Sequence, residues 1–172
     1  MVTYHEHILK RAKKPIDFAL CIIAPIVGVI VAYLVSFIFL FILPIMSFVI
    51  PAVWALCIYL SFKFVMSRNV EFEYLLTDSD LDIDKIINKS RRKRMISVYR
   101  KEIIVMAPVG SKNLPGDWET YTKIDASSSP NAPDAYVLIV QQDSGKKAII
   151  FCPTETMLET MTMRNPRKVF ND

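Results

Sequence analysis

The sequence predicts a hairpin of two membrane-spanning α-helices, followed by an α+β domain in which a bent antiparallel sheet of about seven strands is capped by a C-terminal helix. Hydrophobic residues make up 52% of the 172-residue chain. They are concentrated in one block, because no Asp, Glu, Lys, Arg or His occurs between Phe18 and Phe62. After Arg68 the pattern changes to short β-prone runs separated by turn residues. We expect three parts, at residues 1–15, 16–67 and 68–172.

The uncharged block is too long for a single membrane crossing. At about 1.5 Å per residue, a continuous helix over the block would measure roughly 68 Å, whereas the hydrocarbon core of a bilayer is about 30 Å thick. Pro44 lacks an amide donor and disfavours helical geometry in the residue before it. We therefore place the spans at residues 16–42 and 46–67. A buried hairpin in a soluble protein is the weaker alternative, because so short a chain has little other apolar surface to cover it.

Basic residues flank the apolar block on both sides and are absent from the predicted turn. Because basic residues resist translocation, we expect both termini in the cytoplasm and the hairpin in the plasma membrane. A capping box at Thr3–Glu6 predicts a short N-terminal helix that lies on the anionic inner leaflet. Its expected lipid contacts are Lys10, Arg11, Lys13 and Lys14; Lys63 and Arg68 close the second span.

Small residues recur at every fourth position of the first span, at Gly28, Ala32 and Ser36. Such a stripe lets another helix backbone approach closely. We favour packing within the chain, against residues 46–67. Self-association into a homo-oligomer is the alternative.

Seven strands and one helix are expected in the second half of the chain. Thr154 is a suitable N-cap for the helix, because its hydroxyl can accept a bond from a free amide of the first turn. The strands are predicted at Val70–Thr77, Leu81–Asn88, Arg94–Tyr99, Ile103–Ala107, Tyr121–Ala126, Tyr136–Gln142 and Lys147–Cys152.

This arrangement, directly after membrane spans, resembles the pleckstrin-homology-like (PH-like) domains of small bacterial membrane proteins. The resemblance covers about residues 70–165, and the whole chain is similar to a group of two-span proteins from Gram-positive anaerobes. It implies a fold and a location, and it carries no catalytic signature. The residues that support it are Glu73–Thr77, Leu81–Ile83, Arg91–Arg94 leading into Met95–Val98, and Phe151–Pro153.

A basic stretch close to the second span is the main candidate site. Each cation near an anionic membrane surface contributes about 1 kcal/mol, so contact with lipid head groups is one hypothesis. Aspartates alternate along the neighbouring strand and could instead pair with the cations across the hairpin. We favour cations that are paired in this way or solvated over cations that contact lipid. The basic residues are Lys85, Lys89, Arg91, Arg92, Lys93 and Arg94, and the aspartates are Asp78, Asp80, Asp82 and Asp84.

No motif points to catalysis. The chain has no nucleophile elbow, no phosphate-binding glycine loop and no HExxH sequence. Its two histidines, His5 and His7, have no apparent third partner for a metal. We expect a protein that is not an enzyme, with no cofactor, no metal and no nucleic-acid partner, which binds membrane lipids or an unknown protein partner. The alternative is an accessory subunit of a larger membrane transporter or enzyme complex.

Overall fold

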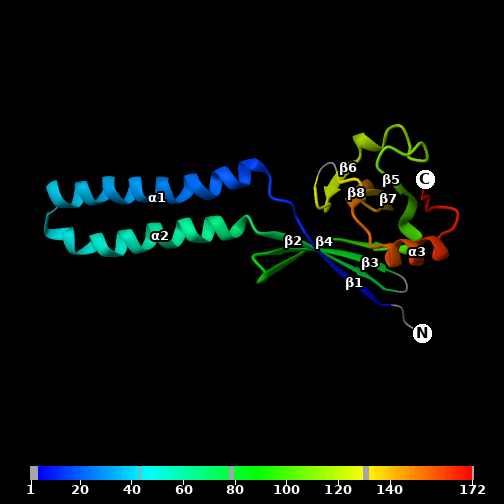
Figure 1. Ribbon diagram of the computed structural model, residues 1–172, viewed down its shortest axis with the longest axis horizontal. Coiled ribbons are helices and arrows are strands. Elements are labelled where there is room, and N and C mark those ends of the chain that lie inside the picture. The colour runs from blue at the N-terminus through cyan, green and yellow to red at the C-terminus, as the bar shows by residue number, and fades with distance from the viewer. Residues whose placement is uncertain (1–3, 43, 78–79, 130–131, 172) are drawn as a thin grey trace. The chain divides into compact units, whose positions relative to one another are not determined.

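The computed structural model describes residues 4–42, 44–77, 80–129 and 132–171 (Figure 1). The chain divides into two compact units. A helical unit comprises residues 13–69, and a sheet unit comprises residues 1–12 together with residues 70–172. The helical unit is therefore an insertion within the sheet unit.

The helical unit is a hairpin. Helix α1 (Pro15–Phe41) and helix α2 (Ile50–Ser67) are separated by a 3-10 turn, η1 (Pro44–Val49), so the chain breaks where Pro44 predicts. Both segments, Pro15–Phe41 and Pro44–Ser67, are long and apolar enough to cross a membrane.

The sheet unit contains two four-stranded sheets, two short 3-10 turns and one α-helix. Sheet A is antiparallel with strand order β1-β2-β3-β4, and sheet B has the order β5-β7-β8-β6. The strands of sheet A are β1 (His5–Lys10), β2 (Val70–Leu76), β3 (Asp80–Ile87) and β4 (Arg91–Tyr99). Those of sheet B are β5 (Ile103–Pro108), β6 (Thr122–Asp125), β7 (Tyr136–Gln142) and β8 (Gly145–Phe151). Short 3-10 turns occur at Arg100–Glu102 and Trp118–Thr120, and helix α3 spans Glu155–Arg164.

The predicted N-terminal interfacial helix is wrong. Residues His5–Lys10 form strand β1, which pairs along its length with β2, from His5 opposite Leu76 to Lys10 opposite Glu71. Alternate side chains of β1 are partly buried, as expected for an edge strand with one face on the core. Thr3, the proposed cap, lies outside the described residues. A six-residue segment gains more from a complete ladder of backbone hydrogen bonds than from an isolated helical turn and a half.

The single seven-stranded antiparallel sheet is also corrected. Strand β1 adds an eighth strand, the strands divide into two sheets, and β6 pairs with β8 in parallel. The seven strands expected between residues 70 and 152 are all present, with ends that differ by up to three residues.

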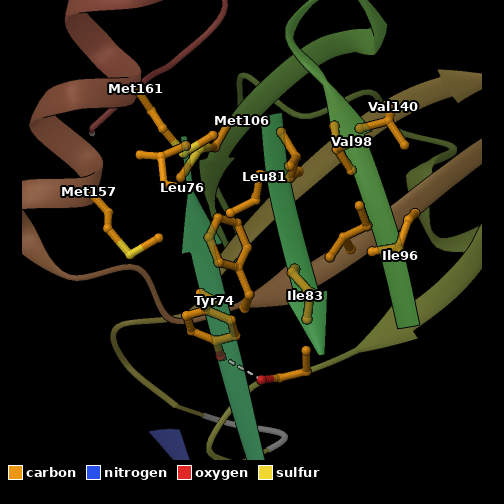
Figure 2. Close-up of a cluster of buried hydrophobic side chains, with 14 of the residues drawn as sticks. Tyr74, Leu76, Leu81, Ile83, Ile96, Val98, Met106, Val140, Met157 and Met161 are labelled. Carbon is orange, nitrogen blue, oxygen red and sulfur yellow. Dashed lines mark hydrogen bonds between the residues drawn. The ribbon is translucent and has the colours of Figure 1, made fainter. Parts of the chain in front are cut away.

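The main core lies between the inner face of sheet A, sheet B and α3 (Figure 2). Met157 and Met161 of α3 point toward strands of sheet A in this view and are almost fully buried. Tyr74 lies at the centre, where its hydroxyl donates to the carbonyl of Ala126 at 2.6 Å and accepts from the amide of Cys152 at 3.3 Å. Burial raises the pKa of Tyr74, so the phenol stays protonated and can donate.

Candidate functional site

A β-bulge determines where the basic stretch points. Ile83 lies opposite Ile96, but Asp84 lies opposite Arg94, so Met95 is one extra residue in β4. A bulge of one residue means that side chains on its two sides no longer alternate in step between the faces of the sheet. Ile96 and Val98 face the core, and beyond the bulge the odd-numbered basic residues occupy that inner face.

On the outer face of sheet A, opposite the core, arginines pair with carboxylates. Arg92 contacts Glu73 at 2.7 Å, and Arg94 contacts Asp82 at 3.1 Å and Asp84 at 3.3 Å. Burial raises the pKa of the Glu73 carboxyl, and the Arg92 guanidinium opposes that shift. The pairing expected between aspartates and the basic stretch thus exists for one arginine, Arg94. Arg92 instead pairs with Glu73, which the sequence analysis did not propose as a partner.

Of the four predicted aspartates, Asp78 lies outside the described residues. Asp82 also accepts a hydrogen bond from the Ser97 hydroxyl. Asp80 has one carboxylate oxygen that is buried without a hydrogen-bond partner.

The remaining basic residues of the stretch lie elsewhere. Lys85 faces Lys93 directly across the β3–β4 pair, and Arg91 lies opposite Ile87, all on the inner face. Lys89 lies at the tip of the turn between the strands, where Asn88 and Lys89 both have positive φ, 52° and 54°. Two successive left-handed residues are typical of the tight turns that match strand twist.

A cavity of about 240 Å³ opens on the inner face next to Lys85. Its wall includes the apolar side chains of Phe72 and Met95 and the polar residues Lys85, Arg11 and Ser127; Asp125 completes it. Arg11 reaches this wall because the chain continues past β1 with the Arg11 amide donating to the Val70 carbonyl at 3.1 Å. The sequence analysis named Arg11 and Lys85 separately and did not group them, because the grouping depends on the pairing of β1 with β2.

The other N-terminal basic residues are dispersed. Lys10 lies opposite Glu71 on the outer face of sheet A. Lys13 and Lys14 are exposed in the helical unit, and the Lys14 amide donates to Asp17 at 3.2 Å. These cations do not share one surface of a helix, as the interfacial-helix prediction required.

The small residues of α1 lie against α2. A Cβ atom added at Gly28 would overlap the hydroxyl of Ser61. Further along, the Trp54 indole donates to the Ser36 hydroxyl at 3.0 Å, and that hydroxyl donates to the Ala32 carbonyl at 2.7 Å. The stripe therefore makes contacts inside the hairpin.

An ion pair that the sequence analysis missed joins the ends of the hairpin. Asp17 is buried in the first turn of α1 and accepts from Arg68, just after α2, with Nε at 3.0 Å and Nη2 at 2.5 Å. The signal for it was a single carboxylate in the first turn of an otherwise apolar helix.

The histidines make ordinary packing contacts. The His5 ring nitrogen lies 3.4 Å from the Thr160 hydroxyl, and the His7 ring stacks at a tilt on Tyr74, with centroids 5.9 Å apart. Within the part of the chain that the structure describes, no three His, Cys, Asp or Glu side chains are grouped to hold a metal ion.

Two β-sheets and a C-terminal helix, interrupted after the first strand by an apolar helical hairpin, define a PH-like domain with a hairpin insertion. The chain belongs to the family described as Bacterial PH-like domain (DUF6106), whose model matches residues 1–171. The resemblance to PH-like domains is therefore confirmed, and the match includes β1 and the hairpin. No curated protein and no solved structure matches the chain.

Proposed function

We propose that this protein is a non-catalytic, membrane-anchored interaction protein whose hairpin crosses the plasma membrane twice and holds the PH-like domain at the cytoplasmic face. One observation carries the proposal. Strands β1 and β2 lie on either side of the hairpin in sequence, yet they pair residue by residue in one sheet. Because a sheet cannot form across a bilayer, both ends of the hairpin return to the same compartment, so the number of crossings is even.

The distribution of charge supports the cytoplasm as that compartment. Lys13 and Lys14 precede α1, and Lys63 and Arg68 lie near the end of α2, whereas the segment from Phe18 to Phe62 contains no charged residue. Basic residues beside a span favour the cytoplasmic side. The Asp17–Arg68 pair then lies where the hairpin meets the interface, and mutual neutralisation lowers the cost of placing both side chains there.

Labelling of single cysteines in cells tests this topology. After the native cysteines are replaced by Ala, Ile45→Cys places a thiol in the turn, where Ile45 is 90% exposed, and Lys112→Cys places one in an exposed loop of the sheet unit. With a membrane-impermeant maleimide, we expect Ile45→Cys to react in intact spheroplasts and Lys112→Cys to react only after permeabilisation. Labelling of Lys112→Cys from outside would refute the proposal.

An accessory subunit of a larger membrane complex is the second candidate function. The observation that favours it is an apolar groove of about 260 Å³ between the two helices, lined among others by Pro25, Trp54 and Val65. Extraction in mild detergent at native abundance, followed by mass measurement, separates the two. Small particles support the anchored interaction protein, and a large stable assembly supports the subunit.

A further inference from the structure

We infer that the inner-face cations at the hairpin-connected end of sheet A bind the head group of an anionic phospholipid, and that the outer-face arginines take no part. We call this group the inner patch; it consists of Arg11, Lys85, Arg91 and Lys93. The inference rests on the proposed function for the source of the ligand. Within the basic stretch, Lys85, Arg91 and Lys93 would bind the ligand, whereas Arg92 and Arg94 stabilise the sheet through ion pairs.

The first step is the charge imbalance between the two faces. On the outer face, Arg92 and Arg94 are within 3.3 Å of carboxylates. On the inner face, Lys85 lies directly opposite Lys93. Among the described residues, neither lysine forms an ion pair, and like charges in directly opposed positions destabilise a sheet. A bound anion would remove that repulsion.

The second step is the neighbouring carboxylate, Asp125, which does not neutralise the patch. Its Oδ1 atom already accepts from the Ser127 amide at 3.0 Å and from the Ser127 hydroxyl at 2.6 Å. One carboxylate also leaves most of the charge of the four cations of the patch unbalanced. A positive excess therefore remains on this face.

The third step is the size and lining of the cavity. Its volume of about 240 Å³ is below the roughly 300–1,000 Å³ typical of pockets that enclose drug-sized ligands. It suits a phosphate with a small substituent, held by Arg11 and Lys85 beside the apolar surfaces of Phe72 and Met95. Acyl chains would have to remain outside the cavity, as they do when a lipid stays in its leaflet.

The fourth step identifies the source of the anion. The strand ends next to the patch are those from which the chain leaves for the hairpin and to which it returns, since Lys10 lies opposite Glu71 and Val70 lies opposite Ile87. The turn that carries Lys89 is at this same end, because Ile87 lies opposite Arg91. Under the proposed function, the covalent connections keep this end within reach of the inner leaflet, which is rich in anionic head groups.

The test uses the full chain in dodecylmaltoside micelles with methyl-¹³C methionine. The Met95 methyl group, assigned by Met95→Leu, reports on the cavity that Met95 lines. We expect a saturable shift of its resonance on titration with dihexanoylphosphatidylglycerol and no comparable shift with dihexanoylphosphatidylcholine. Lys85→Gln with Lys93→Gln should weaken the apparent affinity about 30-fold, if each cation contributes as it does near an anionic surface.

The matched control removes the same charge elsewhere: Lys101→Gln with Lys112→Gln, both exposed, should leave the affinity unchanged. If the double variant loses the wild-type methionine spectrum, the exposed Lys93→Gln alone should weaken binding about fivefold. An equal response to phosphatidylcholine, an unchanged affinity in the patch variants, or an equal loss in the control overturns the inference. So does an equal shift with inorganic phosphate, which would assign the patch to a soluble anion, or tighter binding of hexaglutamate, which would assign it to an acidic protein. None of these outcomes alters the cysteine-labelling pattern, so a failure of this inference can be distinguished from a failure of the proposed membrane topology.

Discussion

The Nε atom of Arg94 lies 3.3 Å from Oδ1 of Asp84, on the face of sheet A opposite the core, although Ile96, only two residues further along the same strand, is buried inside. In a regular strand, side chains two residues apart share a face. The extra residue, Met95, breaks that rule and turns Arg92 and Arg94 toward carboxylates. It also turns Lys93 and Arg91 to the inner face.

Arg92→Gln should destabilise the sheet unit. Glu73 is 5% exposed in its side chain, and removal of its partner leaves a buried carboxylate without a charged donor. We expect a loss of about 1 kcal/mol in the free energy of unfolding, the low end of the range for an orphaned buried group, because Arg92 itself is 60% exposed. A double-mutant cycle with Glu73→Gln measures the coupling energy between Arg92 and Glu73. Additive losses from the two substitutions would contradict the prediction.

Glu73 should also contribute to the pH dependence of stability. Burial raises the pKa of its carboxyl, so the folded state holds the proton at pH values where the unfolded chain has lost it. That contribution is present below about pH 4.3, the unfolded value, and is lost as pH rises through the folded pKa. Relative to Glu73→Gln, the wild-type free energy of unfolding should fall across this window. Thermal unfolding of both proteins at a series of pH values measures the difference between their free energies of unfolding. A difference that does not change with pH would contradict the prediction.

Asp17→Ala should weaken the hairpin. The change removes the acceptor of the two Arg68 contacts and of the Lys14 amide. Hydrogen bonds to charged groups contribute about 1.5–3 kcal/mol, and the exposure of Arg68 favours the lower end. Thermal denaturation in nanodiscs should show a lower midpoint for Asp17→Ala and for Arg68→Gln, with no further loss in the double variant. A further, additive loss would show that the two side chains act separately.

Gly28→Ala should loosen the contact between α1 and α2. The new methyl group would overlap the Ser61 hydroxyl, which now donates to the Cys57 carbonyl at 2.8 Å. Ser61→Ala in the same background removes the overlap, so the double variant should regain most of the lost thermal stability. Gly28→Leu, which no rotation of Ser61 can accommodate, should not be rescued.

Replacement of residues 13–69 by a short linker containing Asn-Gly should yield a soluble sheet domain. The Arg11 amide already donates to the Val70 carbonyl, so the two strand ends are adjacent and a tight turn can join them. We expect a monomer by size-exclusion chromatography with cooperative thermal unfolding. A fragment that begins at Val70 is the control; without β1 it exposes the edge of β2 and should aggregate.

The helical hairpin was predictable because its cause is local. A charge-free block longer than one bilayer thickness, broken at Pro44, requires two helices whatever the rest of the chain does. Strand β1 was not predictable in this way. The segment His5–Lys10 contains signals compatible with a helix, and its strand conformation depends on β2, which follows only after the whole hairpin. A partner so distant in sequence leaves no mark on local periodicity.

By itself, the sequence determined the two long apolar helices, the seven strands after them and the C-terminal helix, because hydrophobic periodicity and turn residues act over a few positions. Tertiary structure alone decided the rest. Pairing with β2 makes the N-terminal segment a strand of sheet A. The pairing of β4 with β3 makes Met95 a bulge, so that alternate residues of the basic stretch lie on opposite faces of the sheet. The physical reason is that the pairing of β4 with β3 must bury Ile96 and Val98. That register, together with the bulge at Met95, sets the faces of Arg91–Arg94.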